Sequence, residues 1–256
     1  MNETNKIKIF QKGFNYSQDG RGNRLVLHLQ GCNMKCPWCS NPEGMPLEGV
    51  IMTERRRNRL SYKEYTIDEL VKECIRSKPM FFDDGGVTLT GGEITMQFEG
   101  IKELLQRLKK EDIHTAIESN GSHPQMEELA PFVDQWIMDV KHYDDVKHKE
   151  WLGVSNKNTT KTLRNVSKTH EDMLVRVPLI PGFNDCEEDA RCFAVYFIRN
   201  MSSKVRVEFL AYHEFGKEKW KQCGMEYKMP NVRLLPGTVK MFEDIMRENG
   251  IICVRT

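Results

Sequence analysis

Short apolar and β-branched runs alternate along this chain with longer amphipathic stretches. The short runs predict strands over 25–29, 87–90, 115–117, 136–140, 174–178, 205–210 and 251–254. The amphipathic stretches predict helices, of which 98–110 (FEGIKELLQRLKK) has the clearest period; the others span 67–77, 124–129, 145–152, 160–170, 187–200 and 239–249. Strands therefore alternate with helices, which is typical of α/β proteins with a parallel sheet.

The number of these units bears on how the sheet is shaped. Parallel strands joined by helices take right-handed crossovers, and the closed arrangement is an eightfold barrel of typically about 250 residues. Roughly six strand–helix units and a terminal strand can be counted, which favours an open, partial (β/α)6 TIM-like barrel. We expect a single domain over 1–256, with an N-terminal extension over 1–23 and functional residues at the C-terminal ends of the strands.

Composition and charge exclude several classes of function. Hydrophobic residues make up 39% and charged residues 29%, as in ordinary globular proteins. Because 38 basic residues nearly balance 37 acidic ones, neither nucleic acid nor a membrane surface is an expected partner. The basic stretch 54–63 is expected to be a solvated loop or helix face. The polar N-terminus and the absence of a long apolar run predict a cytoplasmic protein.

Cysteine usage is the strongest chemical signal. Eight cysteines without an export signal indicate metal binding or catalysis rather than disulfides. Cys32, Cys36 and Cys39 follow the first predicted strand with the spacing C-x3-C-x2-C. Three thiolates on one short loop can bind three corners of a cubic iron–sulfur cluster and leave one iron open for chemistry. The alternatives are a structural zinc site with His28 as the fourth ligand, or three unligated thiols.

Further polar motifs stand at the ends of later predicted strands. They are Thr90-Gly91-Gly92-Glu93, Glu118-Ser119-Asn120-Gly121, Asp139-Val140-Lys141 and Ala211-Tyr212-His213-Glu214-Phe215-Gly216. Paired glycines allow a ligand to approach the backbone, and a glutamate can accept hydrogen bonds from an ammonium group. Arg176, inside an apolar strand, needs a partner such as a cofactor carboxylate, because an unpaired buried charge is costly. Singly, each motif could be a turn, a surface ion pair or a surface histidine; together they favour one site.

The motif set resembles a known superfamily. The cysteine spacing with Trp38 before the last cysteine resembles the radical S-adenosylmethionine (SAM) superfamily, and GCNMKCPWCSNPE resembles the glycyl-radical-enzyme activating enzymes. Over nearly the whole chain, TGGE, ESNG, DVK, RVPLIPG and AYHEFG resemble the family's GGE, DTNG, DxK, RxPxxPG and P[YF]HxxG. Two departures are Ile94 in place of a proline and Glu118 in place of an aspartate.

This resemblance implies a [4Fe–4S] cluster on Cys32, Cys36 and Cys39, with SAM on the open iron. It implies cofactor-binding roles for Trp38, Gly91, Gly92, Glu93, Glu118, Ser119, Asn120, Asp139, Lys141, Arg176 and His213. A monovalent cation is implied near Glu118 and Asp139, although the longer side chain of Glu118 leaves that cation open. Flavodoxin or ferredoxin would supply the electron that cleaves SAM. No catalytic side chain beyond the cluster and SAM is expected, and an easily oxidised cluster predicts an anaerobic setting.

The segment before the first predicted strand bears on the substrate. Asp19-Gly20-Arg21-Gly22-Asn23-Arg24 resembles the family's DGPGIR, a loop near the partner's glycine, which implies substrate contacts for Asp19 and Arg24. The alternative is a glycine-rich turn that opens a strand. Because 40–73 contains no cysteine, the chain resembles the short form without a ferredoxin-like insert. The other cysteines, Cys74, Cys186, Cys192, Cys223 and Cys253, are expected to be free thiols rather than a second cluster.

The function expected from these observations is activation of a glycyl radical enzyme by a monomeric protein that removes a hydrogen atom from a glycine of its partner. One alternative is a radical SAM enzyme acting on a small molecule or a ribosomal peptide, but closely spaced C-terminal cysteines are missing. Another is a non-catalytic iron–sulfur or metal-binding electron-transfer protein, which would leave the SAM-like motifs unexplained. The sequence does not identify the partner enzyme.

Overall fold

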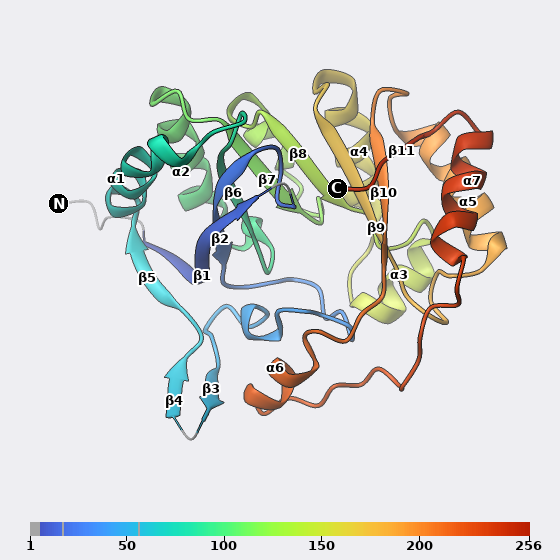
Figure 1. The fold of residues 1–256 in the computed structure, drawn as a ribbon, viewed down its shortest axis with the longest axis horizontal. Helices are drawn as coiled ribbons and strands as arrows, with labels where there is room; N and C mark the ends of the chain where they lie inside the picture. Colours follow the sequence, from blue (N-terminus) through green and yellow to red (C-terminus); the bar gives the residue numbers. More distant parts are fainter. Residues whose placement is uncertain (1–5, 17, 56) are drawn as a thin grey trace.

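The computed structural model describes residues 6–16, 18–55 and 57–256 and centres on one nine-stranded sheet (Figure 1). The strand order is β11-β10-β9-β8-β7-β6-β2-β1-β5. The parallel strands are β2 (Asn23–Leu29), β6 (Gly86–Gly91), β7 (Thr115–Ser119), β8 (Gln135–Asp139), β9 (Met173–Leu179), β10 (Arg206–Ala211) and β11 (Ile252–Cys253). β1 (Lys6–Tyr16) runs antiparallel to both β2 and β5 (Lys63–Thr66).

The α-helices lie around the outside of the curved sheet, except for the short helix 217–222, which lies at one end of the barrel (Figure 1). They are α1 (Ile67–Ser77), α2 (Phe98–Lys110), α3 (Asp145–Leu152), α4 (Lys157–Thr169), α5 (Glu187–Asn200), α6 (Lys217–Gln222) and α7 (Thr238–Glu248), with 3-10 turns η1 (Pro42–Gly44), η2 (Lys78–Met80), η3 (Ile94–Gln97) and η4 (Met126–Phe132). In α2, Ile101, Leu104, Leu105 and Leu108 are fully buried at helical spacing. Burial of each such side chain contributes about 1.5–3 kcal/mol, so this stripe holds α2 on the sheet.

The predicted α/β fold with an open, partial barrel is confirmed. Every predicted strand overlaps an observed one, and α1, α2, α3 and α5 begin and end where the amphipathic period predicts. The strands β5 and β11 form the two ends of the nine-stranded sheet, so the barrel stays open. Within the described residues, no helix has the length and apolar character needed to cross a membrane.

Three local predictions differ from the structure. The helix expected over 124–129 is the 3-10 segment η4, which contains Pro131; proline lacks the N–H that an α-helix needs there. The basic stretch does not form a helix face: it lies mostly in the hairpin of β3 (Ile51–Glu54) and β4 (Arg57–Leu60), with residue 56 outside the described residues. In the predicted extension 1–23, residues 6–16 form β1, and residues 1–5 and 17 lie outside the described part.

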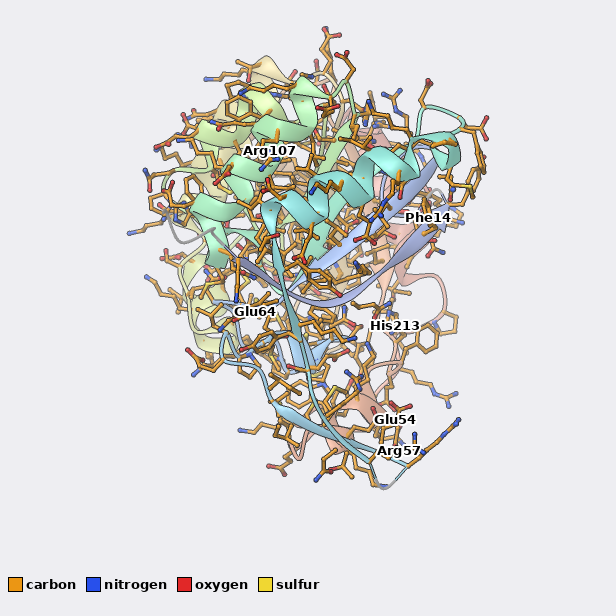
Figure 2. All side chains as sticks on the ribbon, turned by 90° about the vertical axis from the view of Figure 1, so that its left-hand side faces the viewer. Phe14, Glu54, Arg57, Glu64, Arg107 and His213 are labelled. Atoms are coloured by element: carbon orange, nitrogen blue, oxygen red, sulfur yellow. The ribbon has the colours of Figure 1, made fainter. Side chains whose placement is uncertain are left out.

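Figure 2 shows this hairpin projecting from the body of the molecule, with Glu54 and Arg57 near its tip and Arg107 of α2 far above. Arg55 takes a positive φ of 47° in the turn. β4 is exposed over its whole length. The hairpin is therefore a surface feature attached to one end of the sheet.

The register of the parallel strands brings their carboxyl ends to one edge. Leu29 of β2 lies opposite Gly91 of β6, and Ser119 of β7 lies opposite Met138 of β8. Leu179 of β9 lies opposite Ala211 of β10. The loops that carry the sequence motifs therefore meet at the same end of the barrel, as expected for this class of fold.

Candidate active site

A cavity of about 270 Å³ opens at the carboxyl ends of the parallel strands. Most predicted site residues line it: Cys32, Cys36, Trp38, Cys39, Gly91, Gly92, Glu118, Ser119, Asn120, Asp139, Lys141 and His213. A second cavity, of about 600 Å³, is lined by residues that include Asp19, His28, Arg176 and His213. Because His213 lines both cavities, they adjoin at the end of β10.

Backbone hydrogen bonds give the cysteine loop its shape. The amides of Gly31 and Cys32 donate to the carbonyls of Gly44 and Met45, each at 2.8 Å, and the amide of Cys39 donates to the carbonyl of Cys36 at 3.1 Å. Gly31 has a φ of 101°, a conformation that favours glycine. The loop after β2 therefore turns back on itself and presents its thiols to the cavity.

Burial raises the pKa of all three thiols, that of Cys39 to about 12. The neighbouring Cys36 raises the pKa of Cys32 and Cys39 further, whereas the ammonium of Lys141 opposes the rise at Cys36 and Cys39. Thiols must lose their protons to bind metal. These thiols therefore need the positive charge of bound iron to lose their protons near neutral pH. The donor set, three thiols that face one cavity, fits an iron–sulfur cluster.

Two amides already point at the sulfurs. The amide of Met34 donates to Sγ of Cys32 and the amide of Asn41 to Sγ of Cys39, both at 3.4 Å. Within the described residues no three His, Cys, Asp or Glu side chains are grouped to hold a single metal ion. The three thiolates of a cubic cluster each bind a different iron atom.

His28, the alternative fourth ligand, has a packing role. It lies in β2 with its ring 5.5 Å from the ring of Phe10, and it lines the second cavity. Burial lowers its pKa, which favours the neutral imidazole. This placement supports the view that His28 packs inside the strand rather than completing a zinc site.

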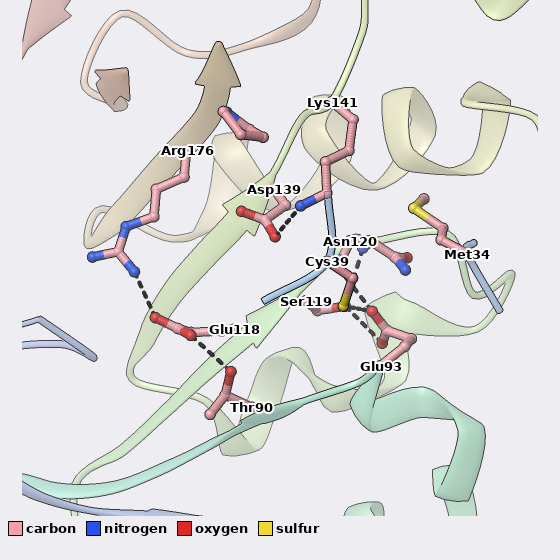
Figure 3. Close-up of polar contacts among 12 residues, drawn as sticks. Met34, Cys39, Thr90, Glu93, Glu118, Ser119, Asn120, Asp139, Lys141 and Arg176 are labelled. Atoms are coloured by element: carbon pink, nitrogen blue, oxygen red, sulfur yellow. Dashed lines mark hydrogen bonds and ion pairs between the residues drawn. The ribbon is translucent and has the colours of Figure 1, made fainter. Parts of the chain in front are cut away.

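The carboxylate of Glu93 connects two strand-end loops (Figure 3). It accepts hydrogen bonds from the amide and hydroxyl of Thr95, from the hydroxyl of Ser119 at 2.9 Å and from the amide of Asn120 at 2.8 Å. Glu93 is buried, with 1% of its surface exposed. The sequence predicts that this carboxylate binds an ammonium group of a ligand; the donors that the structure places on it belong to Thr95, Ser119 and Asn120.

Asn120 extends this connection to the cysteine loop. Its side-chain amide donates to Oδ1 of Asn33 at 2.9 Å, and Asn33 in turn donates to the hydroxyl of Ser122 at 2.7 Å. The loops after β2, β6 and β7 are therefore joined by one polar network beneath the cavity.

Asp139 and Lys141 form an ion pair at the end of β8, with 2.7 Å between Oδ2 and Nζ (Figure 3). Burial acts to lower the pKa of Lys141, but the carboxylate of Asp139 and the nearby Cys36 outweigh it, so the pKa is raised. Lys141 is therefore a permanent positive charge on the cavity wall, beside the cysteines.

Arg176 forms ion pairs with two carboxylates of the protein. Its guanidinium contacts Glu118 at 2.6 Å and Glu208 at 2.9 Å, and Glu118 also accepts a hydrogen bond from the hydroxyl of Thr90 at 2.7 Å (Figure 3). Burial raises the pKa of Glu118 to about 7 although Arg176 opposes this rise. The carboxylate that Arg176 needs is thus supplied by the protein in this structure.

The two predicted substrate contacts lie in different surroundings. Asp19 is partly exposed and lines the second cavity. Arg24 is completely buried, and its guanidinium donates to Thr88 at 2.6 Å and to the carbonyl of Val87 at 2.8 Å. Every atom of Arg24 is shielded at the start of β2, so in this structure the side chain supports the barrel. Its contact with a substrate stays a prediction.

Several wall residues were missed by the sequence analysis. The cavity is also lined by Met34, Ser40, Asn41, Met45, Thr90, Pro178, Ile180, Leu210, Ala211 and Tyr212. Thr90 and Tyr212 stand inside quoted motifs and could have been found there. Met34, Ser40, Asn41, Pro178, Ile180 and Ala211 also stand inside quoted motifs. Met45 and Leu210 lie outside them and carry no motif signal, because an apolar residue that lines a cavity has the same sequence appearance as one in the core.

Comparisons with known proteins agree with this geometry. The family model of the radical SAM superfamily matches residues 26–193. Pyruvate formate-lyase 1-activating enzyme of Escherichia coli strain K12 is 32% identical over 220 residues, which cover 84% of each chain. The 4-hydroxyphenylacetate decarboxylase activating enzyme of Clostridioides difficile strain 630 is 28% identical over 290 residues, with 92% of this chain and 91% of that protein covered.

Solved structures share the fold. A radical SAM methyltransferase from Sphaerobacter thermophilus superposes with a TM-score of 0.63 at 16% identity, covering 99% of this chain and 74% of that one. A domain of a pyruvate-formate lyase-activating enzyme from Bacteroides vulgatus gives a TM-score of 0.52 at 21% identity, covering 66% of this chain and 98% of that one. The chain belongs to the radical SAM superfamily and, within it, to the family of glycyl-radical-enzyme activating enzymes. Membership implies a [4Fe–4S] cluster and SAM as cofactors.

Proposed function

We propose that this protein activates a glycyl radical enzyme by removing a hydrogen atom from a glycine of that partner. The observation that carries the proposal is the convergence of three cysteines and motif residues from successive strand ends on one cavity. The activities of the relatives, activation of pyruvate formate-lyase and of 4-hydroxyphenylacetate decarboxylase, support this class of partner.

In this proposal Cys32, Cys36 and Cys39 hold the cluster. When bound, the cluster and SAM supply the electron and the radical that abstracts the hydrogen atom. The thiols face the cavity, and amides of the loop already donate to two of them, so the loop is shaped for thiolate ligands. The chain's contribution is to bind, orient and shield these groups.

The remaining wall residues would orient SAM. Lys141 and His213 are the cationic and polar groups suited to its carboxylate, and the glycines Gly91 and Gly92 leave space beside the backbone. Trp38 packs 5.1 Å from Phe183 and is 8% exposed, so it offers a fixed aromatic wall for the adenine. Ser119, Asn120 and Asp139 complete the polar side, while the Glu93 carboxylate would act through Ser119 and Asn120.

A monovalent cation does not fit the carboxylate of Glu118. Both oxygens of that group have partners, Arg176 on one side and Thr90 on the other. The guanidinium of Arg176 already supplies a positive charge beside this carboxylate. We therefore expect SAM affinity to change less than about twofold between potassium, sodium and choline buffers. A tenfold requirement for potassium or sodium would contradict this part of the proposal.

The partner's glycine segment would enter through the second cavity. Asp19 and His213 line it, and His213 connects it to the cavity of the cysteines. Arg176 lies between the two regions, held by Glu118 and Glu208. A backbone segment with a small residue could pass along this route to the SAM site.

Several further features belong to the proposal. The 256 residues would act as a single radical SAM domain, monomeric, in the cytoplasm of an anaerobic cell. A small low-potential carrier such as flavodoxin or ferredoxin would deliver the electron. These expectations come from the sequence and the family resemblance.

The test is anaerobic reconstitution with iron and sulfide, followed by reduction and addition of SAM. We expect a [4Fe–4S]+ EPR signal that changes on SAM binding, formation of 5′-deoxyadenosine, and a glycyl doublet when pyruvate formate-lyase or 4-hydroxyphenylacetate decarboxylase is supplied as the first partners. An EPR signal that does not change when SAM is added would favour a non-catalytic electron-transfer protein. SAM cleavage without any glycyl doublet would favour a small-molecule or peptide substrate.

A further inference from the structure

The short helix α6 lies against the cysteine loop although more than 170 residues separate them in the sequence. α6 follows β10, near one end of the sheet, whereas the cysteine loop follows β2, near the other end of the parallel strands. Figure 1 shows α6 at the end of the barrel where the segment after β2 also lies. The segment 216–222 therefore packs against the cysteine loop at the cofactor end of the barrel.

The contact is concentrated on the third cysteine. The indole N–H of Trp220 donates to the carbonyl of Cys39 at 2.8 Å, and Trp220 is 8% exposed. At Gly216 a Cβ atom would lie 2.7 Å from the carbonyl oxygen of Cys39 and 2.6 Å from Cα of Ser40. The backbone that leads into α6 is thus pressed directly against the backbone that carries Cys39.

A second contact comes from the preceding lysine. Nζ of Lys219 donates to Oδ1 of Asn41 at 2.7 Å and forms an ion pair with Glu43 at 2.8 Å, a carboxylate with a side chain 6% exposed. The amide of Asn41 is the group that donates to Sγ of Cys39. Lys219 therefore fixes the residue whose N–H points at the sulfur.

The position of α6 is also tied to the wall that carries His213. The ring of Trp220 packs edge-on against Tyr227 at 5.7 Å, and the hydroxyl of Tyr227 hydrogen-bonds the hydroxyl of Tyr212 at 2.8 Å. Tyr212 directly precedes His213 and lines the same cavity. A shift of α6 would therefore move one wall of the cavity together with the Cys39 corner.

We infer that Lys219 and Trp220 are positioning residues for the cluster: they hold the Cys39–Asn41 turn in the geometry that binds iron, and the charge of Lys219 favours the reduced cluster. The inference rests on the cluster assignment of the proposed function and goes beyond it, because no motif in the cysteine loop contains these residues. Hydrogen bonds to the ligand sulfurs and nearby charge set the reduction potential of such clusters.

The direction of the effect follows from charge. Reduction adds one negative charge to the cluster, so a nearby ammonium stabilises the reduced state and raises the potential. Lys219 also neutralises the adjacent carboxylate of Glu43. Loss of its charge leaves that carboxylate unpaired beside the cysteine loop and should therefore make the potential more negative. Loss of the Trp220 N–H should chiefly loosen the Cys39 corner, so that the cluster is lost faster to a chelator.

The experiment compares full-length variants after anaerobic reconstitution, without SAM. Lys219→Met removes the charge, Lys219→Arg keeps it, and Trp220→Phe keeps an aromatic ring while removing the donor. Lys221→Met, an exposed lysine of the same helix, is the matched control. The midpoint potential is read by EPR-monitored titration, and cluster loss by absorbance in excess chelator; circular dichroism of the apo proteins reports folding.

We expect Lys219→Met to lower the potential, Trp220→Phe to speed cluster loss several-fold, and Lys219→Arg and Lys221→Met to behave like the unchanged protein. Potentials and loss rates of Lys219→Met and Trp220→Phe equal to those of Lys221→Met would overturn the inference. If Trp220→Phe does not fold, the comparison of Lys219→Met with Lys219→Arg tests the inference without it. A protein that holds the cluster but does not cleave SAM would refute the proposed function while leaving this result intact.

Discussion

Cysteines of the same chain differ in chemistry because their surroundings differ. Cys32, Cys36 and Cys39 line the cofactor cavity, whereas Cys74 is fully buried on the core-facing side of α1. Burial also raises the pKa of Cys74, to about 12. What separates these three thiols from Cys74 is the cavity that they face together, which places them to share a cluster.

This difference predicts a pair of unequal substitutions. Cys36→Ser should lose the cluster, because a hydroxyl is a far weaker iron ligand than a thiolate, and iron content after reconstitution should fall to background. Cys74→Ala should keep full iron content and lose on the order of 1 kcal/mol of stability. Equal iron content in the two variants, measured by colorimetric assay and EPR, would argue against the assigned ligands.

Glu118 predicts a particular pH dependence. Its pKa is raised from the ordinary 4.5 to about 7, so the folded protein holds this proton more tightly than the unfolded chain does. Its contribution to stability therefore declines as pH rises from about 4.5 to 7 and is constant above that range. The free energy of unfolding of the unchanged protein, minus that of Glu118→Gln, should fall by roughly 3 kcal/mol across this window, since each pKa unit corresponds to about 1.4 kcal/mol.

Urea unfolding of the two apo proteins at several pH values measures this difference. The comparison isolates the carboxyl group, because glutamine does not titrate and the other groups are common to both proteins. A difference that stays level, or that grows with pH, would mean that the Arg176 pair outweighs burial at this carboxylate.

At the scale of elements, the loops after β2 and β6 interlock at a glycine. A Cβ atom at Gly92 would lie 2.2 Å from the carbonyl oxygen of Gly31 and 2.6 Å from that of Gly44. The amide of Gly92 donates to Leu29 at 2.9 Å. Because backbone meets backbone here, no side-chain adjustment can make room for a methyl group.

Gly92→Ala should therefore separate the two loops. We expect a loss of about 1–3 kcal/mol in stability, as for other overpacked sites, and a SAM affinity reduced at least tenfold. Gly13→Ala in β1, where a Cβ atom meets nothing within 4 Å, is the matched control and should change neither. Urea unfolding and calorimetric SAM titration give the two readings; a Gly92→Ala protein that binds SAM normally would refute this account of the loop contact.

At the scale of the whole molecule, the cofactor cavity is built from the loops of nearly every parallel strand. Residues after β2, β6, β7, β8, β9 and β10 line it, although the sheet itself stays open between β5 and β11. A ligand in this cavity therefore contacts loops from both sides of the open sheet, which strand pairing does not join directly. Binding should stabilise the molecule as a unit rather than one loop.

Hydrogen exchange tests this expectation. With the cluster in place, SAM at a hundred times its dissociation constant should add about 2.7 kcal/mol of stability. Protection should rise together in the loops after β2, β6, β8 and β10, whereas the exposed hairpin β3–β4 serves as an internal control without change. Protection limited to the cysteine loop would show that the loops respond independently.

Local pattern alone determined much of this protein. The helix over Phe98–Lys110 and the apolar parallel strands were predictable because burial on one stripe or on both faces leaves a periodic or continuous apolar signature. The motif residues were predictable as a group because strand ends in such a sheet meet at one edge. The three cysteines were predictable as cluster ligands because they lie close together in the sequence, within one short loop.

Only the tertiary structure decided the partners. It showed that Arg24 is enclosed, that Glu93 is bound by Ser119 and Asn120, and that Arg176 meets Glu118 and Glu208. It also paired β1 with β5 and brought Trp220 to Cys39. These contacts join residues far apart in the sequence. The residues that flank a polar side chain do not indicate which distant group forms its hydrogen bond or ion pair. Periodicity records which face is buried, whereas the choice of partner is made only when the chain has folded.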